Sequence, residues 1–442
     1  MLLALLSLVL ATTVWVLGLV DSVSKPSVAP ALSLEQQELA LLAEPKVPVP
    51  LQSLLVGADP SAALLNSLRQ TPLDRLDERQ RLLFAALESD PEHLRTLQQA
   101  APRADAFAEL QKALTDPGAR DVSVDDRARL LSQAPDPLVR RLACEALGGD
   151  LTSCLDPRSA SAAARRLVIS ELLPLLALLL GGLLLIRHLW LLFRRRLAPW
   201  PALVAPPLAP LDMVLLVAGG FVVLGEVLAP LVVLPVAGLV TRGLAAPLSQ
   251  GITVLFGYVA LAVPPLLILR QQLRTCDPSP PPSGGWLQWR LQPFGTAVLQ
   301  ALRGWLMVMP PVVLTGWLVS RVIGDQGGSN PLLEIVLTSN SALALLLLGS
   351  TIVVLAPLFE ETIFRGVLLP VLGRSLGRAG AVIVSALVFA VAHLSLGELP
   401  PLLVLGLGLG LLRLSTGRLL PCVVMHALWN GVTFLNLLLL GS

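Results

Sequence analysis

Three charged side chains follow an otherwise uncharged run, residues 341–359: Glu360, Glu361 and Arg365. Ionisable groups at hydrocarbon depth are costly, so they are usually paired, face the interior of a helix bundle and mark function. In a helix, Glu361 and Arg365 are i,i+4 neighbours with the acid on the N-terminal side, the order that favours an ion pair. Glu360 projects about 100° away from Glu361 around the helix. One carboxylate is then held in an ion pair, while its neighbour stays free for acid–base chemistry.

Two later apolar segments carry polar groups that fit the same chemistry. His393 stands near the end of one segment, and His426 and Asn430 lie one helical turn apart in the next. The chain has four histidines, and these two fall in its hydrophobic C-terminal third. A lone histidine on an apolar face is more often a hydrogen-bonded core residue than a catalyst. Two glutamates, two histidines and one asparagine on three successive apolar segments instead indicate a hydrolytic site.

The order of these residues resembles the three motifs of the CAAX protease and bacteriocin-processing family, also called CPBP or Abi proteins. The motifs are Glu-Glu-x-x-x-Arg at 360–365, Phe-x-x-x-His at 389–393 and His-x-x-x-Asn at 426–430. The family includes the type II CAAX prenyl endopeptidases. The resemblance covers roughly residues 340–440, and no motif position departs from the pattern. It implies an intramembrane endopeptidase that cleaves membrane-associated protein or peptide substrates.

The resemblance also implies a role for each matching residue. Amide hydrolysis needs a base that activates water, a group that stabilises the oxyanion, and a proton for the leaving amine. Glu360 would be the base, with His393 orienting the same water. His426 and Asn430 would bind the tetrahedral oxyanion. Glu361, paired with the arginine of the first motif, would orient the groups around it.

Other functions use the same residue types. Glu360, His393 and His426 would serve as three zinc ligands with an open coordination position. Asn430 suits an oxyanion hole better than zinc ligation, which favours chemistry without a metal or another cofactor. A transporter, or a membrane scaffold without activity, would also place such residues in a bundle core. A transporter should show repeated halves with broken helices, which the sequence lacks, and a scaffold does not need all five polar residues.

Composition places these motifs in a membrane protein. The chain has 442 residues, of which 54% are hydrophobic and 14% charged, and its mean hydropathy is +0.75. These values predict an all-α, polytopic membrane helical bundle with an N-terminal soluble helical domain. The membrane would be the plasma membrane or an equivalent internal membrane. The net charge of +2 does not suggest nucleic-acid binding, so the predicted partners are the lipid bilayer and a protein or peptide substrate.

The chain divides into four regions by composition. Residues 1–20 are almost entirely apolar and lack the basic start and the small-residue cleavage site of a signal peptide. This predicts an uncleaved signal anchor that forms a transmembrane helix, with a cleaved signal peptide as the alternative. Residues 21–166 show helical spacing of leucines and five Asp-Pro pairs at expected helix starts or turns, which predict an extracytoplasmic α-helical domain. Residues 167–335 hold transmembrane helices and loops, and residues 336–442 hold the catalytic transmembrane core that the resemblance implies.

Basic clusters predict the orientation in the membrane. Three arginines at 194–196 directly follow the second apolar span, and Arg374 and Arg378 follow the first motif. Such clusters mark the cytoplasmic side. With nine apolar spans along the chain, the N-terminus is then cytoplasmic, and both residues 21–166 and the C-terminus are outside. The short span near 399–412 either crosses the membrane or re-enters it.

Three further polar residues have open interpretations. Cys144 and Cys154 both lie in the predicted extracytoplasmic domain, where they either form a disulfide or remain two free thiols. Glu226 interrupts an apolar stretch. An acid at that depth is a functional candidate by default, but here we expect a structural partner or an interfacial position.

Overall fold

The computed structural model describes residues 1–25, 28–99, 107–116, 118, 122–275, 281–323 and 331–441. The described residues are mostly helical and contain no strand. They form two compact units: unit 1 comprises Met1–Ala29 and Pro174–Ser442, and unit 2 comprises Pro30–Leu173. The all-α class predicted from the sequence is confirmed.

Unit 2 is built from short helices with aspartate caps. Asp59, Asp77 and Asp136 each accept a hydrogen bond from a backbone N–H in the first turn of the helix that follows, which satisfies donors left free at a helix start. Four of the five Asp-Pro pairs begin a helix, and Pro117, in the fifth, lies outside the described residues. The elements are α2 (Ala29–Ala43), η1 (Glu44–Lys46), α3 (Val49–Leu55), α4 (Pro60–Gln70), α5 (Glu78–Leu87), α6 (Pro91–Gln99), α7 (Ala108–Thr115), α8 (Val124–Leu131), α9 (Pro137–Ala146), α10 (Leu151–Cys154) and the first part of α11 (Pro157–Phe193).

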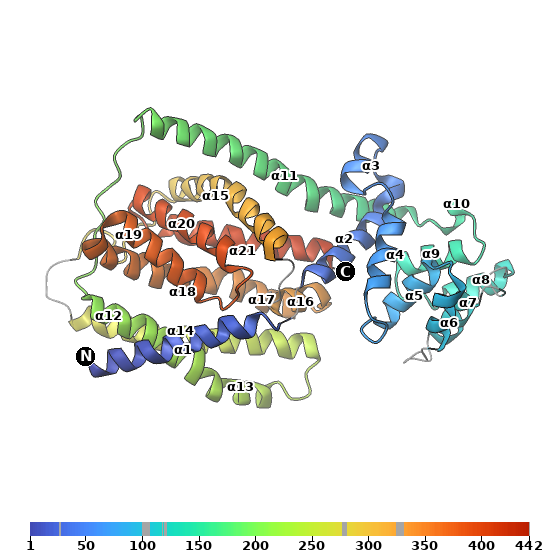
Figure 1. Ribbon diagram of the computed structural model, residues 1–442, viewed down its shortest axis with the longest axis horizontal. Helices are drawn as coiled ribbons and strands as arrows, with labels where there is room; N and C mark the ends of the chain where they lie inside the picture. The colour runs from blue at the N-terminus through green and yellow to red at the C-terminus, as the bar shows by residue number, and fades with distance from the viewer. Residues whose placement is uncertain are drawn as a thin grey trace. The chain divides into compact units, whose positions relative to one another are not determined.

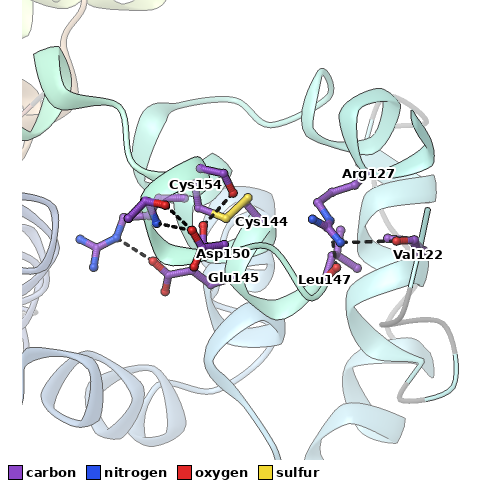
Figure 2. Close-up of a disulfide and its surroundings, with 10 residues drawn as sticks. Val122, Arg127, Cys144, Glu145, Leu147, Asp150 and Cys154 are labelled. Atoms are coloured by element: carbon purple, nitrogen blue, oxygen red, sulfur yellow. Dashed lines mark hydrogen bonds and ion pairs between the residues drawn. A yellow bond between two sulfur atoms is a disulfide. The ribbon is translucent and has the colours of Figure 1, made fainter. Parts of the chain in front are cut away.

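A disulfide between Cys144 and Cys154 joins α9 to α10 (Figure 2). The two Cα atoms lie 5.5 Å apart. The backbone of Gly149 packs against this disulfide, so a Cβ at this position would collide with both sulfur atoms. Of the two states that the sequence left open, the structure has the bonded one. The position of residues 21–166 outside the cytoplasm stays a prediction.

Unit 1 contains the helices that carry the candidate site. Figure 1 shows α20 and α21, in red, as neighbours of α15, and α1, in blue, beside α12. The elements of this unit, besides the second part of α11, are α1 (Leu2–Ser22), α12 (Pro210–Val214), η4 (Leu215–Leu228), α13 (Ala229–Val240), α14 (Ala246–Thr275), α15 (Phe294–Ile323), α16 (Pro331–Thr338), α17 (Ala342–Gly349), η5 (Ser350–Leu355), α18 (Ala356–Glu361), η6 (Thr362–Leu368), α19 (Leu369–Val391), α20 (Leu399–Thr416) and α21 (Leu420–Leu440).

Among the described residues, eight helices are long and apolar enough to cross a membrane. The chain is therefore an integral, multi-pass membrane protein, as predicted. The sequence predicted nine spans, and the difference lies in Ala342–Val391, which forms one run of 50 residues. This run contains two of the predicted spans and changes direction at Gly377, whose φ of 69° and ψ of 175° are not helical. The segment near 399–412 forms the helix α20, which is among the eight.

Close packing of α20 on α19 depends on glycine. A Cβ at Gly406 would meet the side chain and backbone of Ala386 at 3.0 to 3.3 Å, and a Cβ at Gly410 would meet Val382 at 3.0 Å. Small residues of this kind let helix backbones approach each other inside a membrane. The approach brings the backbone of α20 within reach of side chains from η6, which carries part of the first motif.

Candidate active site

The first motif lies where α18 gives way to the π-helical segment η6. Glu360 and Glu361 are the last two residues of α18, and Arg365 belongs to η6. π-helical turns inside α-helices are frequent at functional sites. The side chains of Glu361 and Arg365 are fully buried, whereas that of Glu360 is 15% exposed. The three charges therefore lie inside the bundle and do not begin a loop in water.

Glu361 and Arg365 form the ion pair that their spacing predicts. Nη1 of Arg365 donates to Oε1 of Glu361 over 2.8 Å, and Nη2 donates to the carbonyl oxygen of Gly406 over 3.1 Å. The guanidinium also lies over the ring of Phe389, 4.4 Å from its centroid. A buried charge is tolerated when it is both paired and hydrogen-bonded in this way.

His426 is held by the same carboxylate. Its Nδ1 lies 3.0 Å from Oε1 of Glu361, and its side chain is 4% exposed. Because a carboxylate oxygen only accepts hydrogen bonds, Nδ1 carries a proton, and in the neutral ring the lone pair is on Nε2. Nε2 lies 3.9 Å from Oε2 of Glu360. Glu361 thus fixes the orientation of an imidazole that faces the second glutamate.

Glu360 has one oxygen bound and one free. Its Oε1 accepts a hydrogen bond of 2.9 Å from the hydroxyl of Tyr258, on α14. In the part of the chain that the structure describes, its Oε2 has no hydrogen-bond partner, although the atom is buried. As the helical spacing predicts, the two adjacent carboxylates have different surroundings.

His393 and Asn430 complete the predicted set without touching the glutamates. Nδ1 of His393 donates to the carbonyl oxygen of Phe389 over 2.8 Å, and Nδ2 of Asn430 donates to the carbonyl oxygen of Ile352 over 2.8 Å. The ring of Phe389 contacts both histidines, with centroid distances of 4.8 Å to His393 and 5.7 Å to His426. Within the described residues, neither His393 nor Asn430 is hydrogen-bonded to a glutamate. The structure therefore joins His393 to the site through Phe389.

The zinc alternative requires three ligands around one point. Among the described residues, no group of three or more His, Cys, Asp and Glu side chains is arranged to hold a metal ion. Glu360 and His426 approach each other to 3.9 Å, but His393 does not join them in such a cluster. The side chains, as they lie, do not fit the three-ligand set that zinc takes in catalytic sites.

Two contributors to the site were not predicted from the sequence. Tyr258 is the only tyrosine of the chain and stands in an apolar span, and this was the one available signal. Arg413, which directly follows the short apolar stretch near 399–412, is fully buried. Its Nε donates to the carbonyl oxygen of Arg365 over 3.0 Å, and its Nη2 donates to Oε1 of Gln288 over 3.1 Å. A hydropathy pattern places the end of an apolar span at an arginine, because the pattern contains no information about hydrogen-bond partners on other helices.

Glu226 has the structural partner expected for it. Nε1 of Trp15 donates to Oε2 of Glu226 over 3.2 Å, which links α1 to η4. This acid lies apart from the residues of the three motifs. It ties two membrane helices of unit 1 together.

Comparisons with known proteins identify two regions. Residues 341–432 match the family model described as type II CAAX prenyl endopeptidase Rce1-like, which confirms the resemblance seen in the three motifs. Residues 29–165 match a domain of unknown function, DUF8675. No curated protein and no solved structure matches the chain. The first match contains all seven motif residues and covers less than a quarter of the chain; Tyr258 lies outside it.

Proposed function

We propose that this chain, whose residues 341–432 match the type II CAAX prenyl endopeptidase Rce1-like family, is an intramembrane endopeptidase. It would hydrolyse peptide bonds of membrane-associated proteins or peptides. The observation that carries the proposal is the state of Glu360. Tyr258 holds one carboxylate oxygen, and the other is unpartnered among the described residues and lies 3.9 Å from Nε2 of His426. A fixed carboxylate with one free oxygen beside an imidazole nitrogen suits general acid–base catalysis.

We place the attacking water between Oε2 of Glu360 and Nε2 of His426. Atoms 3.9 Å apart are too distant for a direct hydrogen bond, and a bridging water would connect them. Because Oε2 is buried, the side chains must move apart to admit this water. Glu360 takes a proton from this water while the water oxygen bonds to the scissile carbonyl carbon. The C=O electrons then form a tetrahedral oxyanion. When the C–N bond breaks, Glu360 returns the proton to the leaving amine.

Glu361 acts on this reaction through His426. Its carboxylate accepts hydrogen bonds from Nδ1–H of the imidazole and from the guanidinium of Arg365. The imidazole ring therefore cannot rotate without breaking a buried hydrogen bond. A carboxylate that holds a histidine in one tautomer and orientation is a common arrangement in hydrolases. In this mechanism Glu361 and Arg365 are positioning residues, and neither exchanges protons with the substrate.

The oxyanion needs donors that are already in place. One amide hydrogen of Asn430 is engaged by the carbonyl oxygen of Ile352, which fixes the amide plane and leaves the second hydrogen for the substrate. We assign this second hydrogen to the oxyanion, together with Nε2–H of His426 in a ring that already carries both protons when the substrate binds. The motif resemblance implies that His393 orients the water. Because its ring packs on Phe389 and is hydrogen-bonded to no glutamate among the described residues, this role requires the imidazole to turn toward Glu360 when substrate binds.

Substitution of the base tests the proposal. Glu360→Gln keeps the shape of the side chain and its acceptor for Tyr258, but it removes the base. In cells that express this variant, quantitative proteomics of membranes should find full-length proteins that accumulate relative to the parent. The same proteins, purified and incubated with the parent enzyme in nanodiscs, should be cut at one site, and the variant should cut them at least about 1000-fold more slowly.

A matched control separates the base from a general loss of carboxylates. Asp212→Asn changes a carboxylate to an amide in the same unit, at the exposed start of α12, where the side chain caps Ala209. Its processing should equal that of the parent. Full cleavage by Glu360→Gln would refute the protease proposal and leave the non-catalytic scaffold as the better interpretation.

A further inference from the structure

We propose that α1 is a positioning element of the active site, because Gly18 and Ser22 hold the turn that carries His393. This inference rests on the proposed function, in which His393 orients the water. α1 lies far outside the matched residues 341–432, and its contact with the turn joins residues 374 positions apart in the sequence. The transmembrane helix α1 would then also position residues of the active site.

A buried hydroxyl makes the first contact. The backbone N–H of Leu396 donates to Oγ of Ser22 over 3.1 Å. Ser22 is fully buried, and its own proton is donated to the carbonyl oxygen of Leu19 over 2.7 Å. The hydroxyl therefore has one orientation, with its lone pairs available to the turn. The bond satisfies the backbone N–H of Leu396, a residue that is 41% exposed.

The second contact supports an unusual backbone conformation. Leu394, which follows His393 directly, has a φ of 52°. A residue other than glycine rarely adopts this left-handed conformation, and it persists only where its surroundings impose it. A Cβ at Gly18 would meet Cδ2 of Leu394 at 2.9 Å and Cδ1 at 3.1 Å. The leucine side chain thus packs directly on the backbone of α1.

These contacts hold the turn that follows α19, in which His393 lies. The N–H of His393 donates to the carbonyl oxygen of Ala390 over 3.2 Å, and that of Leu394 donates to Val391 over 3.0 Å. The chain then reverses at Leu394. If this residue relaxed to a right-handed or extended conformation, the last turn of the helix would change direction, and the imidazole of His393 would move with it.

α1 is itself fixed to the bundle. Trp15 donates to Glu226 on η4, and a Cβ at Gly219 of η4 would meet Oγ of Ser7 at 3.2 Å. Ala4 and Ala11, on the same face of α1, are buried. Small residues on this face allow close helix packing. A helix anchored at several points can hold the turn at its end in one place.

The test compares Ser22→Ala with Ser24→Ala in the full-length protein in nanodiscs. Ser24 is a matched control, because it lies at the same end of α1 but is exposed and donates only to Asp21. Hydrogen exchange in residues 392–398 should become about fivefold faster in Ser22→Ala, the effect of losing one hydrogen bond, and should not change in Ser24→Ala. In NMR spectra of protein with ¹³C-labelled histidine, the His393 signal should shift, and the His426 signal should not.

The kinetic parameters test positioning against mere support of folding. With a substrate in hand, Ser22→Ala should lower kcat about tenfold and leave KM unchanged. The proposal is overturned if Ser22→Ala leaves exchange and the His393 signal as in the parent, or if Ser24→Ala alters them equally.

These readouts separate the inference from the proposed function. Exchange and the histidine spectra need no turnover, so they report on the turn whether or not the protein cuts peptides. Unchanged processing in Glu360→Gln together with a shifted His393 signal in Ser22→Ala would refute the protease and retain the contact of α1 with the turn. Lost processing in Glu360→Gln with unchanged spectra in Ser22→Ala would retain the protease and refute the role of α1.

Discussion

The hydroxyl of Tyr258 donates a hydrogen bond to Oε1 of Glu360 over 2.9 Å, from a helix 102 residues earlier in the chain. The bond selects which carboxylate oxygen remains free. With Oε1 engaged by α14, Oε2 is the atom that faces His426. The proposed base is therefore oriented from outside the matched residues 341–432.

Tyr258→Phe removes only this hydroxyl. Hydrogen bonds to charged groups contribute about 1.5–3 kcal/mol, so we expect kcat to fall about 10- to 100-fold while KM stays near the parental value. Steady-state kinetics on a substrate found by proteomics would measure both. Phe256→Leu is the control, since this aromatic residue on the same helix is exposed and its replacement should not alter turnover. Parental kcat in Tyr258→Phe would contradict the orienting role.

Arg365→Ala should destabilise unit 1 as well as abolish activity. It leaves the carboxylate of Glu361 buried without its cation, which costs about 3–5 kcal/mol in comparable pairs. Thermal unfolding of the detergent-solubilised protein should show a clearly lower Tm. Arg378→Ala is the comparison, because that guanidinium is exposed and donates to the carbonyl oxygen of Pro201 over 3.2 Å. Equal Tm values for Arg365→Ala and the parent would mean that the pair contributes nothing to stability.

Activity should not depend on zinc. The three candidate ligands, Glu360, His393 and His426, do not form a metal cluster among the described residues. We expect purified, active protein to contain far less than one zinc per chain by plasma mass spectrometry, and to keep its activity after treatment with a strong chelator. Near-stoichiometric zinc, with activity that is lost on chelation and restored by zinc, would favour the metalloprotease alternative.

Unit 2 should lose stability in acid through Glu88. Burial raises the pKa of this carboxyl, but hydrogen bonds from Arg69 and from the backbone of Ser89 and Asp90 lower it further, to about 2. A folded pKa below the unfolded value of 4.5 stabilises the folded state above pH 4.5, and this contribution is lost as pH falls toward 2. Its size is about 2 kcal/mol once solvent screening around the part-exposed Arg69 is allowed for.

Calorimetry of the full-length protein tests this pH dependence. Glu88→Gln should lower the Tm of the unit 2 transition at pH 7, and the difference from the parent should shrink as pH falls to 3. Glu92→Gln, an exposed change in the same region, should follow the parent at both pH values. A Glu88→Gln deficit that is equally large at pH 3 and pH 7 would show that ionisation is not the cause.

The predicted orientation places the disulfide and the basic cluster at Arg374 and Arg378 on opposite sides of the membrane. Val124 and Leu376 are 76% and 49% exposed, which makes them suitable sites for single cysteines in a background with Cys276 replaced by serine. A membrane-impermeant maleimide should label Val124→Cys in intact cells and Leu376→Cys only after lysis. Labelling of both in intact cells would refute this topology.

The spacing of residues within one helix predicted some contacts of the site, but it did not predict contacts between segments that are distant in the sequence. The pair of Glu361 and Arg365 follows from helical periodicity alone, because both residues lie on one turn. The bond between Tyr258 and Glu360 joins two helices whose relative rotation and depth depend on all the packing between them. A sequence pattern describes one helix at a time, so it identified Glu360 and not the residue that orients it.

The run Ala342–Val391 agrees with the sequence in one respect. Apolar runs separated by Arg374 and Arg378 predict two spans, because charges end a hydrophobic window. The structure breaks the run between these charges, at Gly377, where the backbone is not helical. The role of His393 beside Glu360 stays a prediction, and its ring contacts Phe389, which also contacts His426. Which aromatic ring contacts both histidines depends on side-chain packing that periodicity does not describe.

Position 406 should tolerate no residue other than glycine. The smallest possible substitution there, to alanine, adds a methyl group at 3.0 to 3.3 Å from Ala386, so α19 and α20 would have to separate. The carbonyl oxygen of the same residue accepts from Arg365, and a shift of α20 would withdraw it from the guanidinium. Random mutagenesis followed by selection for activity should thus recover almost no variants at this codon, although its side chain is a single hydrogen atom.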